Sequence, residues 1–261
     1  MFSSISNQCF AIIPARYAST RFPGKPLAML GTRPVIEHVW RRVSKVFGEN
    51  VAVATDDTRI ADCVVGFGGR AVMTSPDHRS GTDRCREAVE LLGVTKNVII
   101  NIQGDEPFVD IESLKNLAGC FVREDVDIAT LARPLPASTP YETIADPALV
   151  KVVISQANTA MYFSRWPIPF CRGIEQKDWT ETTPYYGHIG VYAYRHDVLL
   201  RLASLPQSPL ERAESLEQLR WLQNGYTIAV AYTNAKTIGI DTPEDLEAAR
   251  LFLEKNPEAD A

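Results

Sequence analysis

Three basic residues in a short loop near the N-terminus are the strongest chemical signal in this sequence. Arg16, Arg21 and Lys25 follow the apolar run 10–13, which is typical of a buried strand. Small residues between them, beginning with Ala15, leave room for a ligand close to the backbone. Cations and backbone N–H groups at the carboxyl end of a strand bind phosphate. The loop therefore predicts a polyphosphate site, although a surface turn with solvated charges would have the same composition.

Two aspartates are candidate metal ligands. Asp105 follows the continuous apolar run 98–102, and Asp241 lies between a predicted strand and the start of the last predicted helix. Ligands of open α/β sheets bind at the carboxyl ends of the strands, and Mg²⁺ on a nucleotide is usually held by one or two carboxylates together with phosphate oxygens. The pair predicts a two-carboxylate magnesium clamp. Taken singly, Asp105 could instead cap a turn and Asp241 could belong to a helix cap.

A polar loop at 77–83 is a candidate site for a nucleotide base. It lies between a predicted strand and a predicted helix, and it contains Ser80, Gly81 and Thr82. Side chains and backbone groups of such a loop can form hydrogen bonds with the edge of a base. A plain helix-capping loop would have the same spacing, so both interpretations remain open from the residues alone.

The elements that must position these residues alternate along the chain. Short apolar runs are separated by segments with apolar residues at helical spacing, which predicts a mostly parallel sheet covered by helices on both faces. The predicted strands are 10–13, 51–55, 70–75, 98–102 and 128–133, and the predicted helices are 35–47, 57–67, 82–93 and 111–122.

The composition changes after Pro134, where prolines become frequent. We interpret this part as an extension of the sheet plus a β-rich flap or dimerisation arm. We expect one domain, residues 1–261, with a first half (1–133) that contains the basic loop and the base loop and a second half (134–261) that contains the arm. The predicted elements of the second half are strands at 149–155, 159–163, 186–194 and 226–232, a helix at 211–224 and a last helix from 242.

The overall numbers indicate one enzyme-sized soluble unit. The chain has 261 residues and a formal net charge of −5, which argues against a nucleic-acid partner or an anionic membrane surface. Five scattered cysteines without a C-x-x-C pair indicate reduced thiols in a cytoplasm. No signal-peptide pattern and no apolar run long enough for a membrane span are present. We expect a cytoplasmic protein.

Seven segments in the same order resemble the CMP-KDO synthetase family, the 3-deoxy-manno-octulosonate cytidylyltransferases. The first segment alone is typical of sugar nucleotidyltransferases, and the full set is specific to this family. The similarity extends over nearly the whole chain. The segments are 12–26, 79–83, 103–107, 162–165, 187–192, 216–220 and 239–246.

The resemblance implies a Rossmann-like fold, a homodimer and a reaction. The family transfers CMP from CTP to 3-deoxy-manno-octulosonate (KDO) with release of pyrophosphate, for bacterial lipopolysaccharide synthesis, with Mg²⁺. Arg16, Arg21 and Lys25, beside Ala15, would hold the triphosphate, with Arg16, Lys25 and Asp105 as the catalytic residues. The metal ligands would be Asp105 and Asp241, the nucleotide loop Arg79, Ser80, Gly81 and Thr82, and the sugar site Gln103, Arg165, His188, Tyr192, Glu217 and Gln218.

Other interpretations remain open at this stage. Without the resemblance, Tyr192 could be a core aromatic, and Glu217 and Gln218 could lie on a solvated helix face. The base loop departs from the family pattern at Arg79 and Asp83. A CMP-sialic acid synthetase or another sugar nucleotidyltransferase would share the first loop and the aspartates, and a non-catalytic nucleotide-binding module could share the fold.

Overall fold

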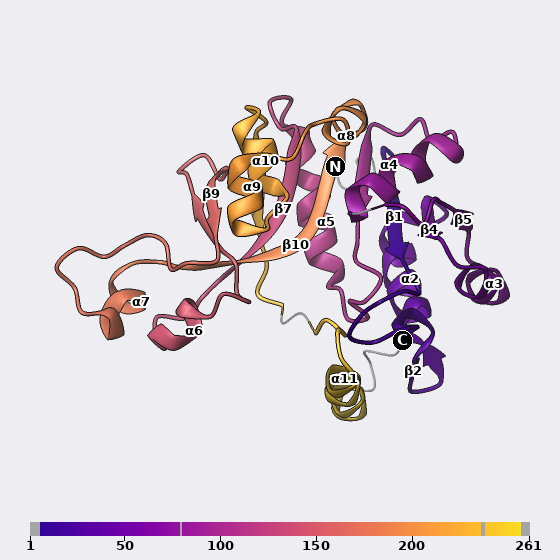
Figure 1. Cartoon of the computed structure of the whole chain (residues 1–261), viewed down its shortest axis with the longest axis horizontal. Coiled ribbons are helices and arrows are strands. Elements are labelled where there is room, and N and C mark those ends of the chain that lie inside the picture. Colours follow the sequence, from indigo (N-terminus) through magenta and orange to yellow (C-terminus); the bar gives the residue numbers. More distant parts are fainter. Residues whose placement is uncertain (1–5, 79, 236–237, 257–261) are drawn as a thin grey trace.

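A nine-stranded sheet forms the centre of the molecule in the computed structural model, which describes residues 6–78, 80–235 and 238–256 (Figure 1). Seven strands follow the spatial order β11-β7-β10-β6-β1-β4-β5, and the hairpin β8–β9 extends the sheet from β10. The strands are β1 (Cys9–Ala15), β4 (Val51–Thr55), β5 (Ala71–Met73), β6 (Val98–Asn101), β7 (Ile128–Pro134), β8 (Lys151–Ile154), β9 (Ala160–Ser164), β10 (Tyr186–Arg195) and β11 (Ile228–Tyr232).

Most neighbouring strands of the main order are parallel, as the sequence predicts. The pairs β1–β4, β1–β6, β4–β5 and β7–β11 are parallel, whereas β10 is antiparallel to both β6 and β7. The residues now assigned to β10 were expected in an extension or an arm. They instead form a strand in the middle of the sheet, because β10 satisfies the backbone groups of both neighbours at once.

Side chains of β1 alternate between two apolar cores, which explains why both faces of the sheet carry helices. Cys9, Ala11 and Ile13 belong to one core, and Phe10 and Ile12 belong to the other. Helices α2 (Val35–Phe47), α3 (Thr58–Gly66) and α5 (Ile111–Gly119) contribute to the first core, and α4 (Gly81–Leu91), α8 (His196–Leu202) and α10 (Gln218–Gln223) contribute to the second.

Local signals in the sequence account for most helix boundaries. Asp57, Ser80 and Asp110 each accept a backbone N–H bond at the start of α3, α4 and α5. Pro34 immediately precedes α2, which begins at Val35 as the sequence predicts. The predicted helix over 111–122 divides into α5 and a 3₁₀ turn, η2 (Cys120–Val122).

The prediction of one helix over 211–224 was wrong, because this segment contributes to two separate helices. Pro209–Glu214 forms α9, and α10 begins at Gln218. Ser215 between them has a φ of 52°, a left-handed conformation that cannot continue an α-helix. Apolar spacing continues across the break, so the periodicity alone gives no sign of it.

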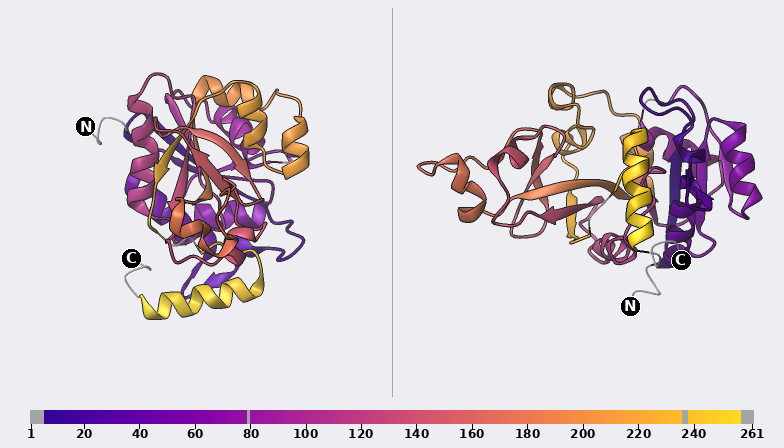
Figure 2. Two further views of the ribbon diagram at one scale, coloured as in Figure 1. Left: turned by 90° about the vertical axis from the view of Figure 1, so that its left-hand side faces the viewer. Right: turned by 90° about the horizontal axis from the view of Figure 1, so that it is seen from below.

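The segment after β7 forms an arm that projects away from the N-terminal half (Figures 1 and 2). It contains the hairpin β8–β9, α6 (Tyr141–Ala145), η3 (Gln176–Asp178) and α7 (Trp179–Thr182). A separate small core holds the tip of the arm together, with Ile144, Cys171, Trp179 and Tyr185 buried in it. The β-rich arm predicted from the sequence is therefore present, although its tip is helical.

The C-terminal helix α11 (Pro243–Lys255) packs on a third core beside a two-stranded ribbon, β2 (Met29–Leu30) and β3 (Arg33–Pro34). A capping box between Thr242 and Asp245 begins the helix, as its sequence predicts. The packing fixes the position of the residues just before α11. In the described part of the chain, no helix is long and apolar enough to cross a membrane.

Candidate active site

A cavity of about 290 Å³ lies at the carboxyl ends of β1 and β6. The chain moves from β1 to β4 on one side and later returns to β6 on the other side of β1, so these two strands flank the switch point at which open α/β sheets bind ligands. The lining residues are Pro14, Ala15, Arg16, Ser19, Thr20, Arg21, Lys25, Pro26, His78, Ser80, Gly81, Arg84, Gln103, Gly104, Asp105 and Asp241.

Lys25 lies between the two predicted metal ligands. Its Nζ contacts Asp105 Oδ2 and lies 3.0 Å from Asp241 Oδ1. Arg21 approaches the other oxygen of Asp241 at 2.8 Å. Burial opposes the charge on Lys25, but the attraction of Asp105 and Asp241 outweighs it and raises the pKa of the ammonium. Burial also opposes the charge of Asp241, but Lys25 and Arg21 outweigh it, so the pKa of this carboxyl is lowered.

The backbone brings Asp241 to Asp105 although the two residues are far apart in the sequence. The N–H of Ile240 donates to the carbonyl of Asp105 at 2.9 Å. The N–H of Asp241 donates to Asp245 Oδ2 at 3.0 Å, within the first turn of α11. The two predicted carboxylates therefore meet because the segment just before α11 is bonded to the loop that follows β6.

These carboxylates fit the magnesium site that the sequence predicts. A single cationic nitrogen, Lys25 Nζ, contacts both of them, so their separation allows one cation to bridge them. Two carboxylates are also the usual protein contribution to Mg²⁺ on a nucleotide, with phosphate oxygens completing the shell. Among the described residues, no group of three or more His, Cys, Asp or Glu side chains could hold a metal ion by itself.

The neighbouring Glu106 carries only a partial negative charge near neutral pH. Burial and the nearby charge of Asp105 raise the pKa of Glu106 to about 7. Its Oε2 atom is buried and has no hydrogen-bond partner among the described residues. A carboxyl group in this environment is partly protonated near neutral pH. The anionic charge next to Lys25 therefore belongs to Asp105 and Asp241.

The loop between β1 and η1 (Lys25–Leu27) is folded around Tyr17. Gly24 has a φ of 72°, and a Cβ atom at this position would lie 3.0 Å from the Tyr17 ring. The guanidinium of Arg59 stacks on that ring at 3.4 Å from its centroid. Arg16 is exposed and lines the cavity. The turn therefore directs Lys25 inward, and Arg16 is accessible to a ligand.

Close packing between the ends of β1 and β6 requires a glycine at position 104. A Cβ atom on Gly104 would lie 2.8 Å from the carbonyl oxygen of Pro14. Such a contact would force the two strand ends apart, because the atom it meets belongs to the backbone. The glycine of the 103–107 segment thus keeps Asp105 next to the basic loop.

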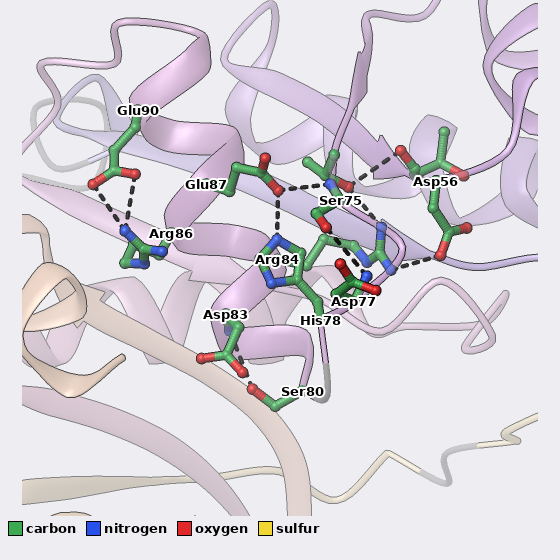
Figure 3. Close-up of polar contacts among 12 residues, drawn as sticks. Asp56, Ser75, Asp77, His78, Ser80, Asp83, Arg84, Arg86, Glu87 and Glu90 are labelled. Atoms are coloured by element: carbon green, nitrogen blue, oxygen red, sulfur yellow. Dashed lines mark hydrogen bonds and ion pairs between the residues drawn. The ribbon is translucent and has the colours of Figure 1, made fainter. Parts of the chain in front are cut away.

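The polar loop before α4 forms another wall of the cavity (Figure 3). Ser80 caps α4 by accepting the N–H of Asp83 at 3.1 Å, and Gly81 is the first residue of the helix. The positive end of α4 therefore faces the cavity, which favours an anionic ligand. Thr82 is buried and does not line the cavity, and Arg79 lies outside the described residues.

His78 and Arg84 also line the cavity. His78 belongs to the loop 77–83 that the sequence predicts as a base site, whereas Arg84 has no role predicted from the sequence. Arg84 is buried and donates to Asp56 at 2.8 Å and to Thr74 at 2.6 Å, so it fixes the loop to the end of β4. His78 contacts Glu87 through Nε2. The sequence could have indicated Arg84 through its spacing of four residues from Ser80, because this spacing places both side chains near the start of α4.

Gln103 is the only predicted sugar residue among those that line this cavity in the described part of the chain. Its Nε2 lies 3.5 Å from the carbonyl of Gly190, in an irregular part of β10 where the register shifts between Ile189 and Tyr192. Bulges of this kind redirect side chains next to active sites. Thr130 of the neighbouring strand β7 lies beside this register shift, and its Oγ1 donates to the carbonyl of Val191 at 2.9 Å.

His188 and Tyr192 lie on β10 on either side of that irregularity. His188 Nε2 lies 2.9 Å from Thr130 Oγ1, and its ring packs edge-on against Phe163. Burial lowers the pKa of His188 to about 3, so the ring is neutral at pH 7. Tyr192 packs against Trp221 of α10, and burial raises the pKa of its hydroxyl. Both side chains are packed in an aromatic cluster and keep partial exposure.

Glu217 connects the second half of the chain to the base loop. Thr82 Oγ1 donates to Glu217 Oε2 at 2.8 Å, and Arg220 donates to the other carboxylate oxygen at 2.8 Å. Burial raises the pKa of Glu217, although the bonds from Thr82 and Arg220 oppose the shift. The next residue, Gln218, is buried at the start of α10. The alternative that these residues form a solvated helix face is therefore wrong.

Arg165 is held by backbone carbonyls. Its Nε donates to the carbonyl of Glu214 at 2.7 Å, and one terminal nitrogen donates to that of Pro147 at 2.9 Å. The carboxylate of Glu214 accepts the Arg165 N–H at 2.9 Å and the Ser164 hydroxyl at 2.6 Å. Arg165 thus fixes the junction of α9 and α10, and its role toward a sugar acid stays a prediction.

Comparison with known proteins agrees with this geometry. The cytidylyltransferase family model matches residues 10–238. The chain is 53% identical to the 3-deoxy-manno-octulosonate cytidylyltransferase of Parabacteroides distasonis, over 93% of this chain and 96% of the relative. It is also 53% identical to the enzyme of the same name from Phocaeicola vulgatus, over 94% of this chain and 96% of that one.

Solved structures give the same result. A CMP:2-keto-3-deoxy-manno-octonic acid synthetase, solved in complex with CTP, superposes with a TM-score of 0.86 at 41% identity, over 95% of this chain and 98% of that one. A cytidylyltransferase from Leptospira borgpetersenii shares only the fold, with a TM-score of 0.56 and 16% identity over 97% of this chain and 96% of the other. The fold and the site thus define a nucleotidyltransferase of the cytidylyltransferase class. Within that class, the chain belongs to the family of 3-deoxy-manno-octulosonate cytidylyltransferases, the CMP-KDO synthetases.

Proposed function

We propose that this enzyme transfers CMP from CTP to KDO and releases pyrophosphate, which supplies CMP-KDO for bacterial lipopolysaccharide synthesis. The observation that supports this most directly is the cavity in which Arg16, Arg21, Lys25 and the start of α4 surround the paired carboxylates Asp105 and Asp241. The names of relatives that are about half identical over nearly the whole chain support the same substrates.

The basic loop binds the triphosphate and neutralises its charge. Arg16 is free to form a planar, bidentate contact with phosphate oxygens, and Lys25 adds a buried positive charge. A hydroxyl oxygen of the sugar attacks the α-phosphorus in line, the bond from that phosphorus to the bridging oxygen breaks, and pyrophosphate leaves. Catalysis of such a step depends mainly on orientation and on stabilisation of charge.

Asp105 and Asp241 would hold Mg²⁺ together with phosphate oxygens of CTP. When bound, the metal supplies Lewis-acid polarisation of the α-phosphate and favours ionisation of the attacking hydroxyl. Lys25 must then exchange part of its contact with the carboxylates for contact with phosphate. The lowered pKa of Asp241 keeps this carboxylate ionised throughout the neutral range.

The sugar acid would bind beside Gln103, toward β10 and α10. This direction is supported by the contact of Gln103 with the irregular part of β10 and by the bond from Thr82 to Glu217. The proposed set is Gln103, Arg165, His188, Tyr192, Glu217 and Gln218. A neutral His188 can donate to or accept from sugar hydroxyls, and a cation is needed for the sugar carboxylate.

A coupled assay of pyrophosphate release tests this function. The purified chain is incubated with CTP, MgCl₂ and either KDO or N-acetylneuraminic acid. Release with KDO and none with sialic acid is expected, whereas a preference for sialic acid would reject the proposed substrate. Addition of EDTA in excess over the metal should abolish release and added Mg²⁺ should restore it, and full activity in EDTA would reject the magnesium requirement.

We further propose a cytoplasmic homodimer. All five cysteines are free thiols, which suits a reducing compartment. The arm exposes large apolar side chains, with Met161 at 62%, Trp166 at 69% and Phe170 at 74% of their surface exposed. Exposed apolar residues gathered on a projecting arm are typical of a protein–protein contact, and a second copy of this chain is the proposed partner.

A further inference from the structure

Arg220 of α10 is a mostly buried cation that contacts two acidic side chains. One terminal nitrogen donates to Glu217 Oε1 at 2.8 Å, and Nε lies 3.2 Å from Glu211 Oε2. The other terminal nitrogen donates to the carbonyl of Leu205 at 2.8 Å, in the segment before α9. The side chain of Arg220 is only 12% exposed. The guanidinium is therefore held by three groups, and its orientation toward Glu217 is fixed.

The acidic partner Glu211 is itself fixed by the start of α9, which lies beside α10 (Figure 1). Glu211 Oε2 accepts the N–H of Ser208 at 3.1 Å, and the N–H of Glu211 donates to Ser208 Oγ at 3.2 Å. These two bonds form the capping box of the helix. The buried carboxylate of Glu211 therefore ties Arg220 to the backbone of α9.

The other oxygen of Glu217 faces the first turn of α4 and the strand β10. Thr82 Oγ1 donates to Glu217 Oε2 at 2.8 Å, and Thr82 follows Gly81, which lines the cavity. Burial and the charges of Tyr194 and Glu217 raise the pKa of the Tyr192 hydroxyl, so Glu217 also lies close to β10. An ionised carboxylate can accept about four hydrogen bonds, so the bonds from Thr82 and Arg220 leave acceptor capacity for a ligand.

We propose that Arg220 is a positioning residue for the sugar acid, which keeps Glu217 ionised and directed toward the start of α4, and that Glu211 orients Arg220. This proposal rests on the proposed function, because it takes Glu217 as an acceptor for hydroxyl groups of the sugar. The donors of Arg220 are directed at Glu217, Glu211 and Leu205. The effect of Arg220 on the sugar therefore passes through Glu217.

The free-energy cost of burying a carboxylate explains why Glu217 needs this cation. Burial raises the pKa of Glu217, whereas the bond from Thr82 and the charge of Arg220 oppose the shift. Loss of Arg220 would raise the pKa further, so more of the carboxyl would be protonated near neutral pH and would accept fewer hydrogen bonds. The charged and titratable groups that act on Glu217 are Asp83 and Cys85 of α4, Tyr192 and Tyr194 of β10, and Arg220.

Double-mutant kinetics test whether Arg220 acts through Glu217. Arg220→Met should raise the KM for KDO about tenfold, as for the loss of one charged hydrogen bond, while the KM for CTP changes less than about threefold. In a Glu217→Ala background, Arg220→Met should change the KM for KDO by less than about twofold, because the residue through which it acts is gone. Two independent effects that multiply in the double variant would overturn the proposal, as would an equal rise of both KM values in Arg220→Met.

A further double variant separates positioning from folding. Arg220→Met leaves two acidic side chains without their cation and should lower the midpoint of thermal unfolding. Adding Glu211→Gln removes one of these charges, which should recover part of the midpoint and leave the KM for KDO raised. Recovery of both would overturn the positioning role. Arg212→Met is the matched control, since Arg212 is an exposed arginine of α9 that donates to the carbonyl of Gln207. An equal rise of the KM for KDO in this control would also overturn the proposal.

The pH profile is a readout that a purely structural role would not move. The KM for KDO of the wild type should rise as the pH falls through the pKa of Glu217. In Arg220→Met this rise should begin about one pH unit higher, and in Arg220→Lys, which retains a cation, the profile should move less. An unchanged profile in Arg220→Met would overturn the proposal.

Carbon NMR of the protein with ¹³C-labelled glutamate measures the same pKa without turnover. The Glu217 carboxyl resonance, assigned with Glu217→Gln, should titrate at a higher pH in Arg220→Met than in the wild type. Identical titration in the two proteins would overturn the proposal. If the wild-type protein used no KDO at all, the proposed function would fail, and this titration would still report whether Arg220 controls Glu217.

Discussion

At the scale of single residues, the ammonium of Lys25 holds the two acidic side chains of the site together. It joins two carboxylates that are far apart in the sequence, and the backbone bond from Ile240 to Asp105 fixes the same pair. Lys25 and Arg21 offset the negative charges of the two aspartates. A substitution at any of these four residues therefore changes the electrostatic potential at the other three. Substitutions here should therefore affect turnover more than they affect folding.

Replacing Asp105 or Asp241 with Asn keeps the size of the side chain and removes its charge. We expect kcat to fall about a hundredfold or more, since each carboxylate supports cation-stabilised charge in the transition state. The midpoint of thermal unfolding should change by only a few degrees. Asp125→Asn, at an exposed pair with Arg123, is the control. Near-normal kcat in both active-site variants would contradict the two-carboxylate clamp.

Arg16→Lys tests whether the exposed guanidinium binds phosphate. A point charge cannot replace a planar fork, so kcat/KM for CTP should fall about tenfold or more with little change in stability. Arg86→Lys, on the surface of α4 and paired with Glu90, should behave like the wild type. If both lysine variants keep wild-type kinetics, Arg16 is only a surface charge.

The mostly buried ring of His188 should make stability depend on pH. Its pKa in the folded protein is about 3, against an ordinary value of 6.5 for the unfolded chain. The unfolded chain therefore binds more protons between these values, and the free energy of unfolding should fall by up to about 1.4 kcal/mol per pH unit as the pH drops from 6.5 toward 3. Denaturant unfolding of His188→Gln should show a smaller fall over this window. An identical fall in both proteins would contradict a neutral buried ring.

Some residues of the site could be predicted from the sequence, whereas some of the contacts between them could not. The basic loop, Asp105 and Ser80 were predictable because each directly follows a strand or precedes a helix. The contact between Thr82 and Glu217 was not, since it joins residues 135 positions apart through the packing of α10 against the sheet. The pairing of His78 with Glu87 depends on the conformation of a polar loop, for which a hydrophobic pattern gives no signal.

At the scale of elements, the break between α9 and α10 governs the proposed sugar side. Ser215 ends α9 in a left-handed conformation, and Arg165 holds the junction through the carbonyl of Glu214. The following residues, Glu217 and Gln218, begin the next helix in a direction that brings Glu217 to Thr82. An uninterrupted helix, as the sequence indicated, would give these side chains a different orientation.

Arg165→Ala and Glu217→Ala should therefore act on the sugar. We expect each to raise the KM for KDO about tenfold while the KM for CTP changes less than threefold, from loss of contacts with the carboxylate and the hydroxyls. Arg165→Ala should also lower the unfolding midpoint by a few degrees, because it loses bonds to two carbonyls. Arg201→Ala, an exposed residue of α8, is the control. A two-substrate kinetic matrix that locates the damage in CTP binding would contradict the proposed sugar site.

At the scale of the whole molecule, the class of fold was predictable and the order of strands was not. Alternating apolar segments predict a mostly parallel α/β sheet, and all nine predicted strands belong to the observed sheet. The residues of β10 predict a strand but do not indicate which strands it pairs with. Its position between β6 and β7 is therefore determined by tertiary packing. The prolines after residue 134 correctly indicated an arm.

The arm should mediate self-association. Phe170→Glu would introduce a charge into an exposed apolar surface, and we expect sedimentation velocity or light scattering to show a shift from dimer to monomer. Val65→Glu, at an exposed apolar position of α3, should leave the oligomeric state unchanged. A wild-type protein that is monomeric at micromolar concentration would contradict the proposed dimer.

The antiparallel strand in the middle of the sheet has a consequence for synthesis on the ribosome. Until residue 195 has emerged, β6 keeps an unpaired edge and β7 has neither of its main-sheet neighbours, because β10 and β11 are both still to come. The first four strands, β1, β4, β5 and β6, can pair earlier with one another. A nascent chain that stalls before β10 therefore exposes an open strand edge, the feature through which incomplete sheets aggregate and which chaperones must cover.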